Sequence, residues 1–171
     1  MKFAKLIFLF VLTIAAIGCS KDDDNGPAPY EYTKDNLTGT YKITFFESRE
    51  VETVNVSGFD VVTTTSSIGD TFNVSSVFAS NNTVTIDGTY RITETVTQGS
   101  QSNTETYIVD IDNETSGYSA NAATAELTID GSTYKVSNFN PTGFTISLSE
   151  TTTEPNGDNS VYTEELRFTK Q

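Results

Sequence analysis

The sequence predicts an all-β protein, an antiparallel up-and-down meander of eight to ten strands that closes into a barrel, with a two-sheet β-sandwich as the alternative. After residue 36, hydrophobic residues recur with a period of two, which gives each strand one buried and one wet face. The 29 Thr and 17 Ser residues favour strands over helices. Closure into a barrel would remove the exposed edges of such a meander.

The segment 83–97 shows the alternation most clearly. Its apolar residues on one parity are Val84, Ile86, Tyr90, Ile92 and Val96. A two-residue loop at Gly88 would set Ile86 opposite Thr89, so we expect an unbroken or bulged strand there. The other expected strands are 39–48, 50–57, 59–66, 70–79, 104–112, 125–130, 133–139, 143–153 and 160–169.

A hairpin is predicted near residue 131, because a Gly in the first loop position suits a type II′ turn. With Gly131 and Ser132 in the loop, Ile129 would pair with Tyr134, and apolar residues would stay on one face. Residues 116–124 are ambiguous, because their Ala residues could form one helical turn.

Residues 1–18 are expected to form a lipoprotein signal peptide. Two Lys residues precede the apolar stretch 6–17, which is shorter than the roughly 20 residues that an anchoring helix needs. The stretch ends at Cys19, and residues 16–19 (Ala-Ile-Gly-Cys) resemble the bacterial lipobox. The resemblance implies cleavage before Cys19 and its acylation, palmitate being one such chain, which would hold the protein at a membrane. The alternative is an ordinary secretory signal.

Residues 19–36 are expected to comprise the acylated Cys and a flexible acidic tether, since Gly and Pro interrupt regular structure there. Ser20, Lys21, Asp22 and Asp23 resemble the lipoprotein export signal of Bacteroidota, which directs proteins to the outer face of the outer membrane. The alternatives are a solvated spacer and a location on the periplasmic face.

The rest of the chain, residues 37–171, resembles bacterial lipocalin-like domains in three places. The segment 36–43 is similar to their opening, segments 72–74 and 82–90 to their middle, and 165–170 to their last strand. The resemblance implies a barrel in which a basic residue from the last strand covers an aromatic ring of the first strand. That ring, a Trp in the family, is Tyr41 here, and Arg167 is the matching cation, with Lys170 as the second candidate.

This pairing requires the strands 39–48 and 160–169 to be neighbours. Arg167 lies on the polar parity of its strand, so it could reach the ring only by laying its aliphatic stem over apolar surface.

Composition argues against several classes of function. With no His and one Cys, His-ligated metals, four-Cys zinc sites and intrachain disulfides are excluded. The net charge of −13 argues against a nucleic-acid partner. Residues 110–114 space oxygen ligands alternately but lack the Gly and Glu of an EF-hand. Glu94 and Glu164 share the apolar parity of their strands, and we expect them to be solvated near the barrel mouth. The alternative is an inward acid that binds a polar group of a ligand or has a raised pKa. We therefore expect no enzyme, cofactor or metal.

The first expectation for function is a surface-exposed, membrane-anchored lipoprotein whose barrel binds a small apolar or amphipathic ligand. The alternative is a filled β-domain that serves as a scaffold or interaction module for protein partners at the cell envelope. The residues expected to line the cavity or core are Tyr41, Phe45, Phe72, Tyr90, Ile92, Tyr107, Val109, Phe144, Ile146 and Phe168.

Overall fold

The computed structural model describes residues 30–171; the expected signal peptide, Cys19 and the export residues Ser20 to Asp23 lie outside the described residues. The described chain is all-β apart from one short helix, α1 (Lys34–Leu37). The strands are β1 (Gly39–Val56), β2 (Phe59–Phe78), β3 (Thr83–Gln98), β4 (Gln101–Asn121), β5 (Glu126–Ile129), β6 (Ser132–Asn140), β7 (Gly143–Thr153) and β8 (Asn159–Lys170). None of the helices within residues 30–171 has the length and apolar character needed to cross a membrane.

The sheet closes on itself, as the sequence predicted. Each strand pairs antiparallel with the next one in the chain, and β8 returns to pair with β1. The closing seam runs from the pair Tyr41–Lys170 to the pair Thr53–Asn159. All eight strands therefore belong to one ring-bonded sheet, and the sandwich alternative is wrong.

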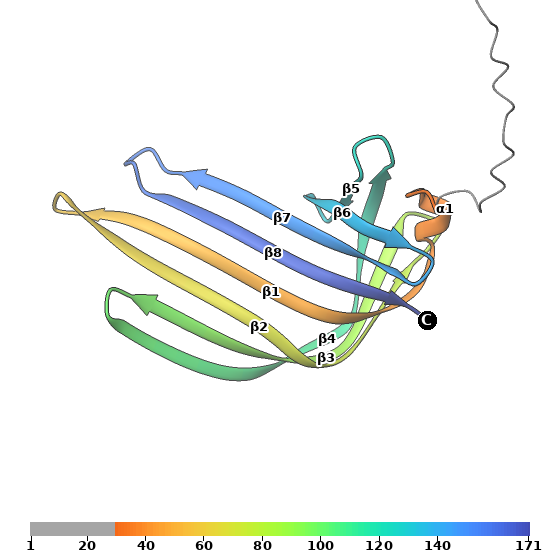
Figure 1. The fold of residues 1–171 in the computed structure, drawn as a ribbon, viewed down its shortest axis with the longest axis horizontal. Coiled ribbons are helices and arrows are strands. Elements are labelled where there is room, and N and C mark those ends of the chain that lie inside the picture. Colours follow the sequence, from red (N-terminus) through yellow and green to blue (C-terminus); the bar gives the residue numbers. More distant parts are fainter. Residues whose placement is uncertain (1–29) are drawn as a thin grey trace, which may run out of the picture.

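The ring is complete at only one end of the molecule. β4 pairs with β3 along most of its length, but with β5 only over residues 118–121. β7 likewise pairs with β6 only up to Ser147. Beyond the short β5–β6 hairpin, the other six strands continue as an open curved sheet (Figure 1). We call the end beside α1 the closed end and the opposite end the open end.

Bulges bend the long strands where the closed end meets the open sheet. The register shifts between Ile43 and Phe45 in β1, between Asp70 and Asn73 in β2, and opposite Ile86–Gly88 in β4. β3 itself runs without interruption from Thr83 to Gln98, which confirms the unbroken strand expected at Gly88; the extra residues lie in its neighbours β2 and β4. Extra residues at these positions increase the local twist and bend of a strand. This bending allows one long strand to form part of both the closed end and the open sheet.

Two groups of expected boundaries are corrected by the structure. The separate strands 39–48 and 50–57 form the single strand β1, and 59–66 and 70–79 form β2. The strand expected over 104–112 extends through Asn121, so residues 116–121 are strand and not a helical turn.

The predicted β5–β6 loop is wrong by one residue. Asp130 and Gly131 occupy it with φ of 48° and 89°, and Ile129 pairs with Ser132. Asp tolerates the left-handed conformation, so Asp-Gly forms a turn with two positive φ angles. Tyr134 was expected opposite Ile129 and instead lies opposite Leu127, a shift of two residues. A shift of two leaves the same side chains facing inward, so the alternation of apolar residues could not distinguish the two registers.

Aromatic side chains fill the closed end. Tyr41, Phe78, Phe144 and Phe168 are each at most 4% exposed, and the Phe144 and Phe168 rings stack with centroids 4.6 Å apart. Leu37 of α1 is fully buried against this cluster. The Tyr41 hydroxyl donates a hydrogen bond to the Leu37 carbonyl at 2.9 Å, so the helix covers the closed end through both apolar and polar contacts.

Candidate functional site

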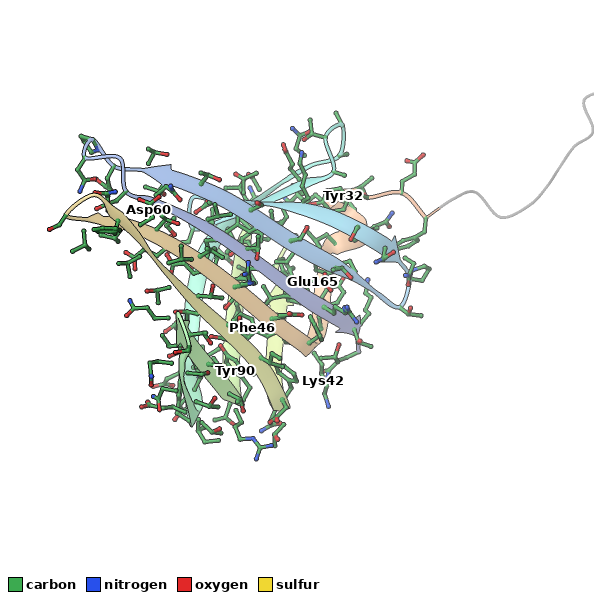
Figure 2. The ribbon with its side chains drawn as sticks, turned by 60° about the vertical axis from the view of Figure 1, so that its left-hand side comes forward. Tyr32, Lys42, Phe46, Asp60, Tyr90 and Glu165 are labelled. Carbon is green, nitrogen blue, oxygen red and sulfur yellow. The ribbon has the colours of Figure 1, made fainter. Side chains whose placement is uncertain are left out.

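An apolar pocket of about 210 Å³ lies between the filled closed end and the open sheet. Its lining residues are Ile43, Phe46, Phe72, Val74, Ile86, Tyr90, Ile111, Glu164 and Leu166. Figure 2 labels Phe46 on β1 and Tyr90 on β3, two strands that are separated in the sheet by β2. Ile43 and Val74 are also members of the buried cluster at the closed end, so the pocket has a rigid base.

The bulges determine which side chains enter this pocket. The bulge at Thr44 reverses the parity of β1, which brings Phe46 inward and turns Phe45 outward. Phe72 follows Thr71, which has a φ of 52° inside the β2 bulge. The Phe72 and Tyr90 rings stack with centroids 5.7 Å apart, and Phe46 meets Tyr90 edge-on at 5.9 Å.

Gly69 makes room for this aromatic group. A Cβ at Gly69 would lie 2.8 Å from the Phe72 ring and 3.1 Å from Cβ of Phe46. The absent side chain is therefore a packing requirement of the pocket wall.

Glu164 is the one charged residue in the pocket lining. The Tyr162 hydroxyl donates a hydrogen bond to Glu164 Oε2 at 2.5 Å. Burial, and secondly the nearby Glu164 carboxylate, raises the pKa of Tyr134 to about 12. The same two causes raise the pKa of Tyr90 and of Tyr162, so these hydroxyls stay protonated at neutral pH and can act as donors. The pocket thus offers an apolar body and one acidic acceptor.

A larger hollow of about 420 Å³ is lined mainly by charged and hydroxyl side chains of β1, β6, β7 and β8. Leu148 is its one hydrophobic lining residue. Apolar ligands gain free energy in proportion to the apolar area removed from water, so the smaller pocket is the better candidate site.

The residues expected to line one cavity divide into four groups. Phe72 and Tyr90 line the pocket. Tyr41, Phe144, Ile146 and Phe168 belong to the core of the closed end. Ile92, Tyr107 and Val109 lie on the same inner face towards the open end, where Tyr107 is 43% exposed. Phe45 is the exception, because its ring lies on the outer face beneath the Arg167 guanidinium, 4.1 Å from the ring centroid.

The expected contact between Tyr41 and Arg167 is wrong, although the adjacency of their strands is confirmed. Lys170 pairs with Tyr41 in the β1–β8 register, and its Nζ lies 5.6 Å from the Tyr41 ring centroid. The Lys170 ammonium also donates a hydrogen bond to the Asn36 carbonyl at 3.3 Å. Lys170, the second candidate named from the sequence, is therefore the cation that covers the Tyr41 ring.

Phe46 and Val74 were not among the expected lining residues. The adjacent pair Phe45-Phe46 places an aromatic ring on each parity, so the sequence does not reveal which ring faces inward. Val74 shares its parity with Phe72 and Phe78, and this alternation could have identified it.

Glu94 lies on the inner face, as its parity predicted. It accepts hydrogen bonds from Tyr107 at 3.3 Å and from Ser67 at 3.5 Å. Within residues 30–171, no group of three or more acidic, His or Cys side chains is placed to hold a metal ion.

A scan against protein-family models, a search of curated proteins and a search of solved structures each gave no match. The fold and pocket therefore define the class: a small all-β protein whose antiparallel meander closes at one end and opens at the other.

Proposed function

We propose that this protein binds a small apolar or amphipathic ligand in the pocket between β1, β2, β3, β4 and β8. The supporting observation is the pocket lining, in which eight apolar or aromatic side chains surround the cavity and Glu164 provides one acidic group. Sites for small molecules commonly combine a mainly apolar wall with a few polar groups that set orientation.

The size of the pocket limits what it can enclose. Its volume of about 210 Å³ lies below the roughly 300–1,000 Å³ of sites for drug-sized molecules. The enclosed part of a ligand is therefore a fused-ring system or a short hydrocarbon segment. A polar or basic end group would lie next to Glu164, and a longer ligand would continue over the inner face towards Tyr107.

A second candidate function is that of an interaction module for other proteins. Two observations favour it: the closed end is filled by its own aromatic side chains, and large apolar side chains are exposed on the sheet. Ile108 and Ile68 on the outer face are 64% and 55% exposed. A partner protein that covered the outer face would remove such apolar side chains from water.

A neutral naphthylamine dye that fluoresces in apolar surroundings tests the ligand-binding proposal. We expect saturable enhancement with the wild-type protein and its loss in Ile111→Trp, because the larger side chain fills the pocket. Ile108→Trp on the outer face of the same strand is the matched control and should bind as the wild type does. Equal binding by both variants, with circular dichroism showing both folded, would contradict the pocket assignment.

We also propose that the protein is a lipid-anchored lipoprotein on the cell exterior, on the strength of residues 16–19 and Ser20 to Asp23. Tyr30, near the start of the described chain, stacks on Phe139 with ring centroids 5.3 Å apart at the closed end. An anchor at Cys19 would therefore hold the closed end towards the membrane, and the open end would face away.

Cell fractionation tests the anchor. Cys19→Ala should move the protein from the membrane fraction to the soluble fraction and abolish labelling by a fatty acid. Replacement of Lys21, Asp22 and Asp23 by Ala should protect the protein from protease added to intact cells. A Cys19→Ala protein that still labels would contradict the lipoprotein proposal, and unchanged protease sensitivity would contradict the export signal.

A further inference from the structure

The open end leaves a long strand edge unpaired. β4 pairs with β3 from residue 101 to residue 117, but within residues 30–171 no strand pairs with its other side over that range. The facing edge of β7 is likewise unpaired over residues 148–153. Such edges present backbone N–H and C=O groups that can pair with an added strand.

The inner face beside this edge carries a strong negative charge. Directly opposed residues of antiparallel strands point to the same side of a sheet. Glu94 is opposite the inward Ser67, and Glu105 is opposite Glu94, so both glutamates point to the inner face, where Glu94 also contacts Tyr107. Towards the open end, the pairings of β8 with β1 and β7 place three more glutamates on the inner face. Glu50 and Glu150 lie on either side of Tyr162, and Glu52 lies beside Ser160.

The basic side chains of these strands lie on the other face. Arg91 pairs with Asp70 at 2.7 Å on the outer surface, and Arg167 covers the outward ring of Phe45. Arg49 pairs in register with Ser66, next to the inward Ser67 and therefore on the outer side. The inner face of the open end consequently has no cation to neutralise its glutamates within the described residues.

We propose that the free edge of β4 binds an extended, basic segment of another polypeptide by strand addition. A Lys or Arg on the inward side of the added strand would lie opposite Glu105 and near Glu94. Opposite charges in direct cross-strand positions stabilise a sheet, whereas like charges destabilise it. An apolar residue two positions along would meet the half-exposed ring of Tyr107.

Charge also argues against a second copy of this chain on the same edge. Each copy carries a net charge of −13, and edge-to-edge pairing would bring the Glu105 side chains of both copies towards one strip of sheet. An inward charge on an edge strand is a known device against self-association. The free edge of β4 therefore disfavours pairing with a second copy of this chain and favours a positively charged partner.

The binding segment does not depend on the apolar pocket proposed above. The free part of β4 nearest the open end, residues 101–109, lies beyond the pocket, whose β4 contribution is Ile111. Loss of dye binding in Ile111→Trp and loss of peptide binding at the edge are therefore separate results.

A labelled peptide of about nine residues, in which Lys and Val take turns at every second position and Thr occupies the positions between them, provides the probe. Its fluorescence anisotropy is measured with the full mature protein in non-ionic detergent at physiological salt. We expect saturable binding that is weakened about fivefold or more in Glu94→Gln/Glu105→Gln. The control variant Glu47→Gln/Glu154→Gln removes the same charge from the outer face of β1 and from the turn between β7 and β8. It should leave the affinity for the peptide unchanged.

Two further peptides separate strand addition from simple charge attraction. The same sequence with alternate backbone amides N-methylated keeps its charge but cannot pair with β4, and should lose most of its binding. A version with Glu in place of Lys should not bind. Amide hydrogen exchange should show protection by the unmodified peptide confined to residues 101–109.

Several results would overturn the proposal. These are no binding by the wild type, equal binding of the N-methylated peptide, equal effects of the two charge-removing variants, or protection elsewhere than β4. A stable dimer that the peptide fails to dissociate would assign the edge to a second copy and would also overturn it.

Discussion

Gly88 illustrates how one residue holds the bend between the closed end and the open sheet. It has a φ of 122°, in the range that favours glycine, and a Cβ there would lie 2.0 Å from the Asn73 carbonyl oxygen. The backbones of β2 and β3 approach each other so closely only because this position has no side chain. The register shifts in β2 and β4 lie next to this position.

Gly88→Ala should therefore reduce the free energy of unfolding by about 2–4 kcal/mol, through backbone strain and a steric clash. Gly117→Ala is the matched control in the neighbouring strand, because no atom lies within 4 Å of the position that its new methyl group would occupy. We expect it to change stability by less than about 1 kcal/mol. Urea unfolding followed by circular dichroism measures both, and equal effects would contradict the packing role of Gly88.

Lys170 is the second residue whose role is specific to its position. Its ammonium lies over the Tyr41 ring and donates to the Asn36 carbonyl, so it joins the last strand to the helix and the first strand. Lys170→Met keeps the apolar stem but removes both interactions, and should lower the free energy of unfolding by about 1 kcal/mol.

Arg49→Met removes one positive charge from an exposed outer position of β1 and serves as the control. Chemical denaturation of the two variants side by side would distinguish a specific contact from a general charge effect. A larger loss in Arg49→Met than in Lys170→Met would exclude the proposed role of Lys170.

At the scale of the elements, alternation predicted the strands that keep one parity and failed where parity changes. β3 was predicted almost to its ends, because its apolar residues keep one parity through Gly88. In β1, Phe45-Phe46 occupies both parities, and only the partner strand decides that Thr44 bulges. The closure of the meander followed from the need to pair its edges, but the unequal lengths of β4 and β5 leave one long edge free. The pocket arises from these bulges and was for that reason predicted only in part, through Phe72 and Tyr90.

At the scale of the whole molecule, buried tyrosines connect stability with pH. Burial raises the pKa of Tyr41 to about 12 and, together with Glu164 as the second cause, that of Tyr134 to the same value. In an unfolded chain tyrosine titrates near about 10. Above that pH the unfolded state releases protons that the folded state retains, so alkaline solution favours unfolding.

We therefore expect the free energy of unfolding to be insensitive to these groups below about pH 9 and to fall as pH rises from about 10 towards 12. Tyr134→Phe should make this decline shallower, because one titrating group is removed. Urea unfolding at a series of pH values measures the slope. A free energy that stays constant or rises through this range would contradict the buried, protonated state of these tyrosines.

The central proposal is that a ligand binds in the pocket on the inner face, between the closed end and the open end, and not on the outer face. A methyl proton–carbon NMR spectrum recorded during titration with the neutral naphthylamine dye tests it most directly. The account predicts saturable shifts for the methyl groups of Ile43, Ile86 and Ile111 in the pocket, with those of the outward Ile68 and Ile108 unchanged. Shifts confined to Ile68 and Ile108, or no saturable shift at any of the five, would contradict it.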